Sequence, residues 1–199
     1  MSQRTAEIER RTGETSVSLK LGLDGDGAGS RATGVGFLDH MLDLLARHAR
    51  IDLDVKVTGD LQTGAHHTVE DTGIVLGQAL DRALGERRGI VRYGHAVVPM
   101  DEARAQCAID VSGRPFAAVE GFERLPAGDI AGFEHELAEE FFRAVASAAR
   151  LTLHLELQAG TNAHHMIEAC FKAFARALRA AVATDPTETG VPSTKGTLT

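Results

Sequence analysis

Apolar and polar residues alternate in four segments of the chain, and this spacing predicts β-strands with one buried face. Residues 51–57 and 151–157 carry an apolar side chain at every odd position. Two further segments, SVSLKLGLDG (16–25) and AQCAIDVSG (105–113), alternate in the same way and each ends in a glycine. Glycine at the end of an alternating run is typical of a turn, so these segments predict one more strand in each half of the chain.

The same order of elements occurs twice along the sequence. Residues 37–60 and 137–160 match at an offset of 100, and each has an amphipathic stretch followed by a strand-like alternation. After a two-residue gap the match resumes with AHHTVEDTGIVLGQALDRAL (65–84) and AHHMIEACFKAFARALRAAV (163–182). Both are rich in helix formers with apolar residues three and four positions apart, so each predicts a helix that begins near its histidines.

We expect the order strand, strand, helix, strand, helix in each half, and the alternating segments above locate two of its three strands. This order indicates an α+β fold of two pseudo-symmetric halves, each a small sheet covered by two helices. The glycines of residues 87–94 would end a helix, which places the boundary there. We expect one domain over residues 1–199, with halves of about 1–92 and 93–199, and a C-terminal segment, 185–199, that is extended rather than helical.

Composition narrows the functional class. The formal charge of -7 argues against bulk nucleic-acid binding, which needs a basic face. The apolar runs are too short to cross a bilayer, and the polar N-terminus has no signal-peptide segment, so a cytoplasmic location without membrane contact is expected. Cys107 and Cys170 lie in apolar stretches and are interpreted as reduced core residues.

Histidine is the unusual residue, with nine copies against one tyrosine and no tryptophan. The two predicted helices carry a His-His-x-x-Glu motif, at residues 66–70 and 164–168. On a helix the first histidine and the glutamate, four positions apart, share a face, whereas the second histidine is turned away by about 100°. A single pair at a helix start is more often a cap or a surface feature. Its duplication, with the same glutamate spacing, favours metal binding.

Pseudo-twofold packing of the halves would let the second histidine of each motif reach the ion held by the other motif. The internal repeat adds one more ligand to each ion, because His40 aligns with Glu140. The predicted ligands are His40, His67, His164 and Glu168 for one ion, and His66, Glu70, Glu140 and His165 for the other.

Imidazole and carboxylate ligands without thiolate suit Mn²⁺, Fe²⁺ or Zn²⁺. Four protein ligands leave room for substrate only if the geometry is octahedral, and this favours Mn²⁺ over tetrahedral Zn²⁺. We therefore expect two Mn²⁺ ions per active site.

Six segments in this order resemble the imidazoleglycerol-phosphate dehydratases of histidine biosynthesis, over essentially the whole chain. They are FLDHML (37–42), AHHTVEDTGIVLGQAL (65–80), RYGHAVVPMDEA (92–103), DVSGRP (110–115), HHMIEACFKAFARALRAA (164–181) and PSTKG (192–196). The resemblance implies a hydro-lyase whose halves are like the second domain of ribosomal protein S5. It also implies trimers that assemble into a hollow twenty-four-subunit particle, with active sites at subunit contacts. Many relatives carry histidine, in a His-Phe-Phe pattern, where this chain has Glu140. Three alternatives stay open for this position: a carboxylate ligand, a water-bridged contact with the ion, or a vacant ligand position.

The implied reaction converts imidazole glycerol phosphate to imidazole acetol phosphate, through a metal-bound imidazolate and a diazafulvene-like intermediate, without an organic cofactor. Proton transfer needs a carboxylate. Glu14 matches the family's substrate-contacting glutamate and is the candidate acid/base and substrate contact, with a solvated glutamate as the alternative; Asp101 and Glu102 hold the corresponding place in the second half. The metal ligands His66, Glu70, His164 and Glu168 are counted with Glu14 as catalytic.

Phosphate recognition needs fixed cations and hydrogen-bond donors. The residues that match family substrate positions are Arg92, Arg114, Lys172, Ser193, Thr194 and Lys195. For Lys172 an exposed helix lysine is the alternative.

Two other functions are compatible with clustered histidines. A zinc protease would carry His-Glu-x-x-His, with the glutamate between the ligands, which is not the order here. A metal-storage assembly would need no organophosphate site, so the basic residues of 110–115 and 192–196 argue against it.

Overall fold

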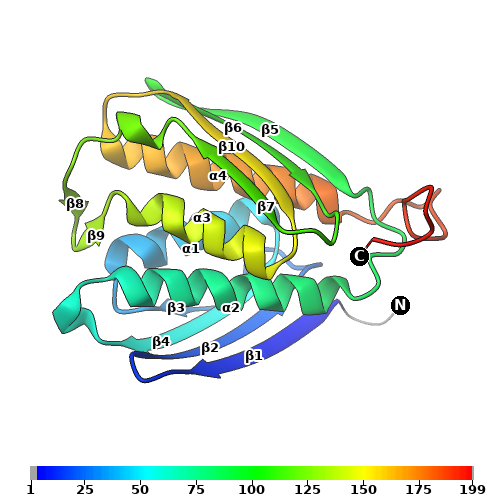
Figure 1. Ribbon diagram of the computed structural model, residues 1–199, viewed down its shortest axis with the longest axis horizontal. Coiled ribbons are helices and arrows are strands. Elements are labelled where there is room, and N and C mark those ends of the chain that lie inside the picture. The colour runs from blue at the N-terminus through cyan, green and yellow to red at the C-terminus, as the bar shows by residue number, and fades with distance from the viewer. Residues whose placement is uncertain (1–3, 199) are drawn as a thin grey trace.

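Two sheets enclose a layer of four helices in the computed structural model, which describes residues 4–198 (Figure 1). The first half supplies β1 (Thr5–Arg11), β2 (Thr15–Gly22), β3 (Arg31–Ala32), α1 (Gly36–Ala49), β4 (Asp52–Gly59) and α2 (His66–Leu84). The second half supplies β5 (Tyr93–Met100), β6 (Ala103–Asp110), β7 (Phe116–Glu120), α3 (Leu137–Ala148), β10 (Thr152–Ala159) and α4 (Ala163–Val182). Short elements fill the connections: the 3-10 turns η1 (Leu61–Thr63) and η2 (Phe122–Arg124), and the hairpin β8 (Asp129–Ile130) and β9 (Phe133–Glu134).

The two sheets have equivalent topology. Their strand orders are β1-β2-β4-β3 and β5-β6-β10-β7, and in each the last strand pairs parallel while the other pairs are antiparallel. The register is equivalent too, since Leu19 lies opposite Val55 in one sheet and Cys107 opposite Leu155 in the other. The predicted α+β fold of two similar halves is confirmed.

Alternation decides which face of each sheet is covered. The apolar positions of β2, β4, β6 and β10 are buried against the helices, whereas their polar neighbours face outward. Cys107 and Cys170 are buried free thiols, as predicted. Burial raises the pKa of both thiols far above the ordinary value, which keeps them protonated.

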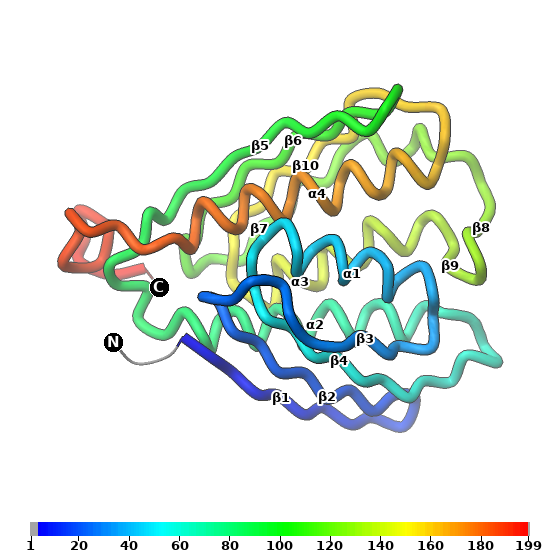
Figure 2. Tube along the Cα trace, turned by 180° about the vertical axis from the view of Figure 1, so that it is seen from behind, coloured from blue at the N-terminus to red at the C-terminus, as the bar shows by residue number. Residues whose placement is uncertain are grey.

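The halves join through their helices, with α2 beside α3 and α1 beside α4 (Figure 2). Both pairs run parallel. Gly73 lies against Ala144 and, one turn later, Gly77 lies against Ala148. The chain direction is therefore the same in α2 and α3. Glycine is needed at Gly77 because an added Cβ would come within 2.7 Å of the Val145 carbonyl oxygen. The four helices therefore begin at one end of the molecule, and the C-terminal segment lies at the other (Figure 1).

The predicted half boundary lies in the connection between α2 and β5. Helix α2 ends at Leu84 and β5 begins at Tyr93. Residues 185–198 contain turns and bends but no helix; residues 1–3 and 199 of the predicted domain lie outside the described part. Within residues 4–198, no helix combines the length and the apolarity needed to cross a bilayer. The strands β3, β7, β8 and β9 were not predicted, because they are short or lack an alternating apolar pattern.

Candidate metal centre and active site

His40, His164 and Glu168 converge where α1 and α4 begin. The Nε2 atoms of His40 and His164 lie 3.6 Å and 3.0 Å from Glu168 Oε2. A metal ion about 2.1 Å from two donors would separate them by about 3.0 Å at a right angle or about 3.4 Å at a tetrahedral angle. These three side chains are the one group in residues 4–198 that offers three such donors within 4.8 Å of one another. Their chemistry and spacing fit a divalent cation.

Glu168 is the buried member, with a side chain 7% exposed, while both histidines are open to solvent. Burial by itself would raise its pKa. The hydrogen bond and charge of Lys172, whose Nζ lies 2.5 Å from Oε1, together with His164, lower it more, so the net pKa shift is downward. Glu168 is therefore held as a carboxylate, the form that binds metal.

Helices α2 and α3 begin with a second set of predicted ligands. His66 Nε2 lies 3.9 Å from Glu70 Oε2 at the start of α2. Gly73 packs against Ala144 where the parallel helices α2 and α3 meet. Glu70 and Glu140 lie one turn before this contact, each on its own helix, and so at a similar level. Glu140 is half-buried on α3.

The second histidine of each motif has different partners. His67 Nδ1 lies 3.0 Å from Asp60, and its Nε2 lies 3.6 Å from Glu14. His165 Nδ1 lies 2.8 Å from Glu102, and its Nε2 lies 3.9 Å from Asp101. Neither ring belongs to the three-ligand cluster described above. Packing of the two halves within one chain thus does not complete the four-ligand sets in the way that the sequence predicted.

Local hydrogen bonds fix the backbone around these histidines. Asn162 caps α4 by accepting from the backbone N–H groups of His164 and His165. Glu102, on the β5–β6 turn, accepts from Thr161 N at 3.1 Å and Asn162 N at 2.8 Å. The hydrogen bond with His165, joined by these backbone bonds, lowers the pKa of Glu102 to about 2.

The predicted phosphate contacts form a separate cavity. Arg92, Arg114 and residues 193–195 line a cavity of about 840 Å³ together with Glu188. The Arg92 guanidinium donates to Asp110 at 2.7 Å and to the Pro192 carbonyl at 2.8 Å, which holds the tail in place. Lys172 is not among the lining residues, because it contacts Glu168.

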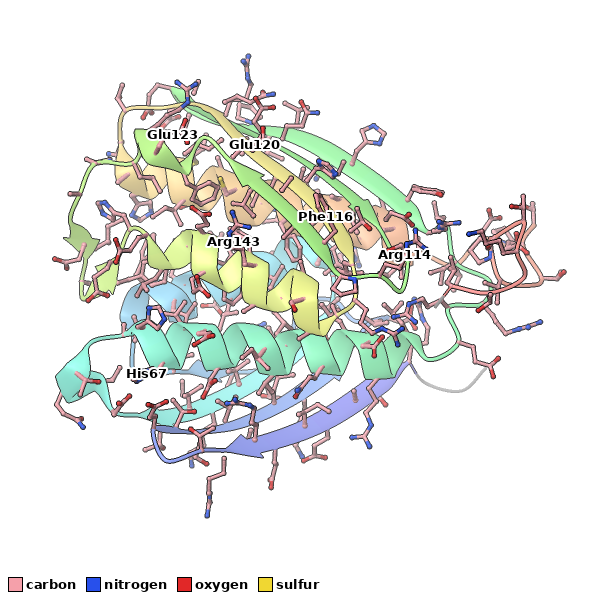
Figure 3. All side chains as sticks on the ribbon, viewed as in Figure 1. His67, Arg114, Phe116, Glu120, Glu123 and Arg143 are labelled. Atoms are coloured by element: carbon pink, nitrogen blue, oxygen red, sulfur yellow. The ribbon has the colours of Figure 1, made fainter. Side chains whose placement is uncertain are left out.

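The cavity and the metal ligands lie at opposite ends of the molecule (Figure 3), where His67 and Arg114 are far apart. Helix α4 starts at the histidines and ends just before the tail. Its 20 residues, at 1.5 Å each, span about 30 Å. Metal ligands and phosphate contacts of one chain therefore do not meet.

One residue that contacts these histidines, Asp60, was not singled out from the sequence. Asp60 directly follows β4, and only the tertiary structure places its carboxylate on His67. The available signal was weak: an acidic residue in the strand-to-helix connection six positions before the first histidine of the motif.

A duplicated α+β fold with imidazole and carboxylate donors at its helix starts is the architecture of a candidate metal-dependent enzyme. The family model "Imidazoleglycerol-phosphate dehydratase" matches residues 33–178. A relative of that name from Azorhizobium caulinodans is 58% identical over 98% of each chain, and one from Symbiobacterium thermophilum is 56% identical over 100% of this chain and 94% of its own. The chain belongs to the imidazoleglycerol-phosphate dehydratase family, and the predicted membership in this family of hydro-lyases is confirmed.

Solved structures agree with this assignment. The dehydratase from Staphylococcus aureus superimposes with a TM-score of 0.81 at 40% identity, over 90% of this chain and 99% of that one. The enzyme from Pyrococcus furiosus gives a TM-score of 0.80 at 36% identity, over 96% of this chain and 100% of that one.

Proposed function

We propose that the chain dehydrates imidazole glycerol phosphate to imidazole acetol phosphate in L-histidine biosynthesis, with two divalent metal ions per active site. The cluster of His40, His164 and Glu168 supports the metal requirement, and family membership supports the reaction. Donor chemistry favours Mn²⁺, with Fe²⁺ and Zn²⁺ as alternatives. A cytoplasmic location without membrane or nucleic-acid partners accompanies this proposal.

Each metal site is completed by a second copy of the chain. The first site combines His40, His164 and Glu168 with the second histidine of the α2 motif, His67, from a neighbour. The second site combines the α2–α3 ligands His66, Glu70 and Glu140 with His165 from a neighbour. Partly exposed rings at the molecular end support this arrangement, because both second histidines face away from the ligands of their own chain.

Phosphate recognition supports the same requirement for neighbours. The cavity with Arg92 and Arg114 lies one helix length, about 30 Å, from the metal ligands of its own chain. A substrate of this size cannot bridge that distance, so its phosphate must meet the cavity of another subunit. We accordingly propose the trimers and the twenty-four-subunit particle that the family resemblance implies, with active sites at the contacts between chains.

The chain's own residues supply proton transfer and substrate orientation. Bound metal ions would act as Lewis acids that stabilise negative charge on the substrate's imidazole ring. Expulsion of the hydroxyl group next to the ring, as water with the proton given up by the ring, gives a diazafulvene-like form of the substrate. Loss of the neighbouring carbon-bound proton and return of a proton to the ring then give the enol of the product. Glu14 is exposed beside His67 and is the proposed carrier of the carbon-bound proton. Arg92, Arg114, Ser193, Thr194 and Lys195 orient the phosphate, and Lys172 keeps Glu168 ionised.

The direct test is consumption of imidazole glycerol phosphate by the purified protein with Mn²⁺, against a chelated sample. We expect turnover only with metal. A metal-loaded protein without turnover would refute the proposed activity and favour metal storage. Removal of residues 192–199 should raise KM strongly, because the tail lines the phosphate cavity; unchanged kinetics would exclude the tail from the site.

Subunit sharing is tested by mixing two inactive variants. His164→Ala damages the metal end and Arg114→Ala the phosphate end. In mixed particles about one quarter of the sites would receive both intact ends, so activity should return on co-refolding. Activity that stays absent, although mixed particles form, would mean that each chain holds its own site.

A further inference from the structure

Each second histidine of the two motifs has a carboxylate on its Nδ1 atom. Asp60 Oδ2 lies 3.0 Å from Nδ1 of His67, and Glu102 Oε2 lies 2.8 Å from Nδ1 of His165. On the other ring nitrogen, Nε2, the nearest carboxylates are at 3.6 Å and 3.9 Å, too far for a hydrogen bond. The two rings thus have the same polar environment in both halves.

The carboxylates on Nδ1 come from different places in the two halves. Asp60 follows β4, whereas Glu102 lies on the β5–β6 turn. The position that corresponds to Asp60 in the internal repeat is Gly160, which has no side chain to offer. The same contact is therefore made twice by residues that the duplication does not relate.

Gly160 could not have supplied the carboxylate. Its φ of +148° lies in the region that L side chains rarely adopt, and an added Cβ would come within 2.3 Å of Met166 Cγ. A carboxylate on His165 had to come from another segment. Glu102 reaches it, and its other oxygen accepts from the backbone of residues 161 and 162.

A carboxylate on Nδ1 has a defined effect on a metal-binding histidine. It keeps the proton on Nδ1, so the Nε2 lone pair is free for the ion, and it fixes the orientation of the ring. Such partners also make the ring a stronger donor, and their loss typically weakens metal binding 10- to 100-fold.

We propose that Asp60 and Glu102 are positioning residues, one for each metal site, which hold His67 and His165 in the Nδ1-protonated form with Nε2 directed at the ion. This inference rests on the proposed function in one respect, because it takes both histidines as ligands. It assigns a role to Asp60 and Glu102 that is separate from acid/base catalysis.

The test compares variants that remove the carboxylate with one that keeps an acceptor. Asp60→Ala and Glu102→Ala lose the hydrogen bond, whereas Asp60→Asn retains an amide oxygen. Glu102 has no equivalent amide variant, because both of its oxygens accept hydrogen bonds and a glutamine has one acceptor oxygen. Glu9→Gln, on the exposed edge strand β1, is the matched control for loss of one negative charge. Mn²⁺ binding is measured by calorimetry at about pH 8, where an ordinary histidine is neutral.

Each alanine variant should weaken one of the two classes of Mn²⁺ site about 10- to 100-fold, and leave the other class unchanged. Asp60→Asn should recover most of the loss, and the control should bind like the unaltered protein. Alanine variants that bind both ions normally, or an Asp60→Asn variant as weak as Asp60→Ala, would overturn the proposal.

A second readout does not depend on metal binding. Nitrogen-15 spectra of the histidine-labelled, metal-free protein distinguish the two neutral forms of an imidazole ring. One ring should leave the Nδ1-protonated form in each alanine variant but not in Asp60→Asn. If unaltered protein bound no Mn²⁺, the proposed function would fail, while the spectra would still decide the role of the carboxylates. Glu102 also accepts from the backbone at the start of α4, so if Glu102→Ala does not fold, the Asp60 variants decide the proposal.

Discussion

The close contact between α2 and α3 at Gly77 gives the sharpest test of the fold. In Gly77→Ala the new Cβ would meet the Val145 carbonyl oxygen at 2.7 Å, Ala148 Cβ at 2.7 Å and Ala149 N at 2.8 Å. Two of these atoms belong to the backbone, so the overlap cannot be relieved by rotating a side chain. The helices must move apart instead.

Two opposing terms set the magnitude. Alanine is favoured over glycine inside a helix by about 1 kcal/mol. Forcing an extra carbon into a packed interface costs about 1–3 kcal/mol. Gly36 provides the control, since an added Cβ there has no atom within 4 Å, but as the first residue of α1 it gains little of the interior helix preference. We expect Gly77→Ala to be less stable than Gly36→Ala by up to about 2 kcal/mol, the cost of packing less the gain in helix preference.

Urea unfolding of the chelator-treated proteins, at one protein concentration, measures the free energies of unfolding. If Gly77→Ala were as stable as Gly36→Ala, the helices would not be in the described contact. A separate consequence concerns the second metal site, because the same contact holds Glu70 and Glu140 on neighbouring turns. Gly77→Ala should therefore also weaken one class of Mn²⁺ site, as measured by calorimetry.

Three further predictions concern buried charge, pH and metal removal. Asp71 is buried, accepts a hydrogen bond from Thr15 and pairs with Arg10 at 2.6 Å, so Asp71→Ala should cost about 2–3 kcal/mol in urea unfolding; an unchanged midpoint would contradict the pairing. Hydrogen bonds to their carboxylate partners raise the pKa of His67 and His165 above 6.5. Protons then compete with the ion, so Mn²⁺ affinity measured by calorimetry should fall as the pH drops through a value above 6.5, and a pH-independent affinity would count against these ligands. Chelation should abolish turnover but leave the far-ultraviolet circular dichroism unchanged, because the predicted ligands lie outside the apolar core; loss of helix signal would show that the metal also supports the fold.

The sequence predicted the architecture well wherever one side chain pattern ran over a whole element. Strict alternation located the inner strands β4 and β10, and the repeat located all four main helices. It did not reveal β3 or the β8–β9 hairpin, which are two residues long per strand and carry no periodic signal. The pairing of β3 with β4 depends on tertiary contacts, whereas β8 and β9 form a local hairpin that is too short for an alternating pattern.

The metal ligands were predictable to the extent that helix geometry determines them. The spacing of four positions predicted His164 beside Glu168, and the structure brings these two side chains and His40 into one cluster, while their role as ligands stays a prediction. Helix geometry also predicted that His67 and His165 point away from the first histidine of each motif, as observed. It could not predict which side chains these two rings contact. Their carboxylate partners come from a strand end and a hairpin turn, and the backbone alone brings these segments together.

The halves are alike in backbone and unlike in charge, and this difference has a consequence for the two metal sites. The proposed first site has three imidazoles and one carboxylate, whereas the second has two of each because Glu140 stands where the repeat has His40. The ligands of the second site thus carry one more negative charge and one more oxygen donor. Oxygen-rich sites favour harder cations such as Mn²⁺ over Zn²⁺. In the proposed sites the repeat keeps the places of the ligands but changes their chemistry, so we expect the two ions to bind with unequal affinity.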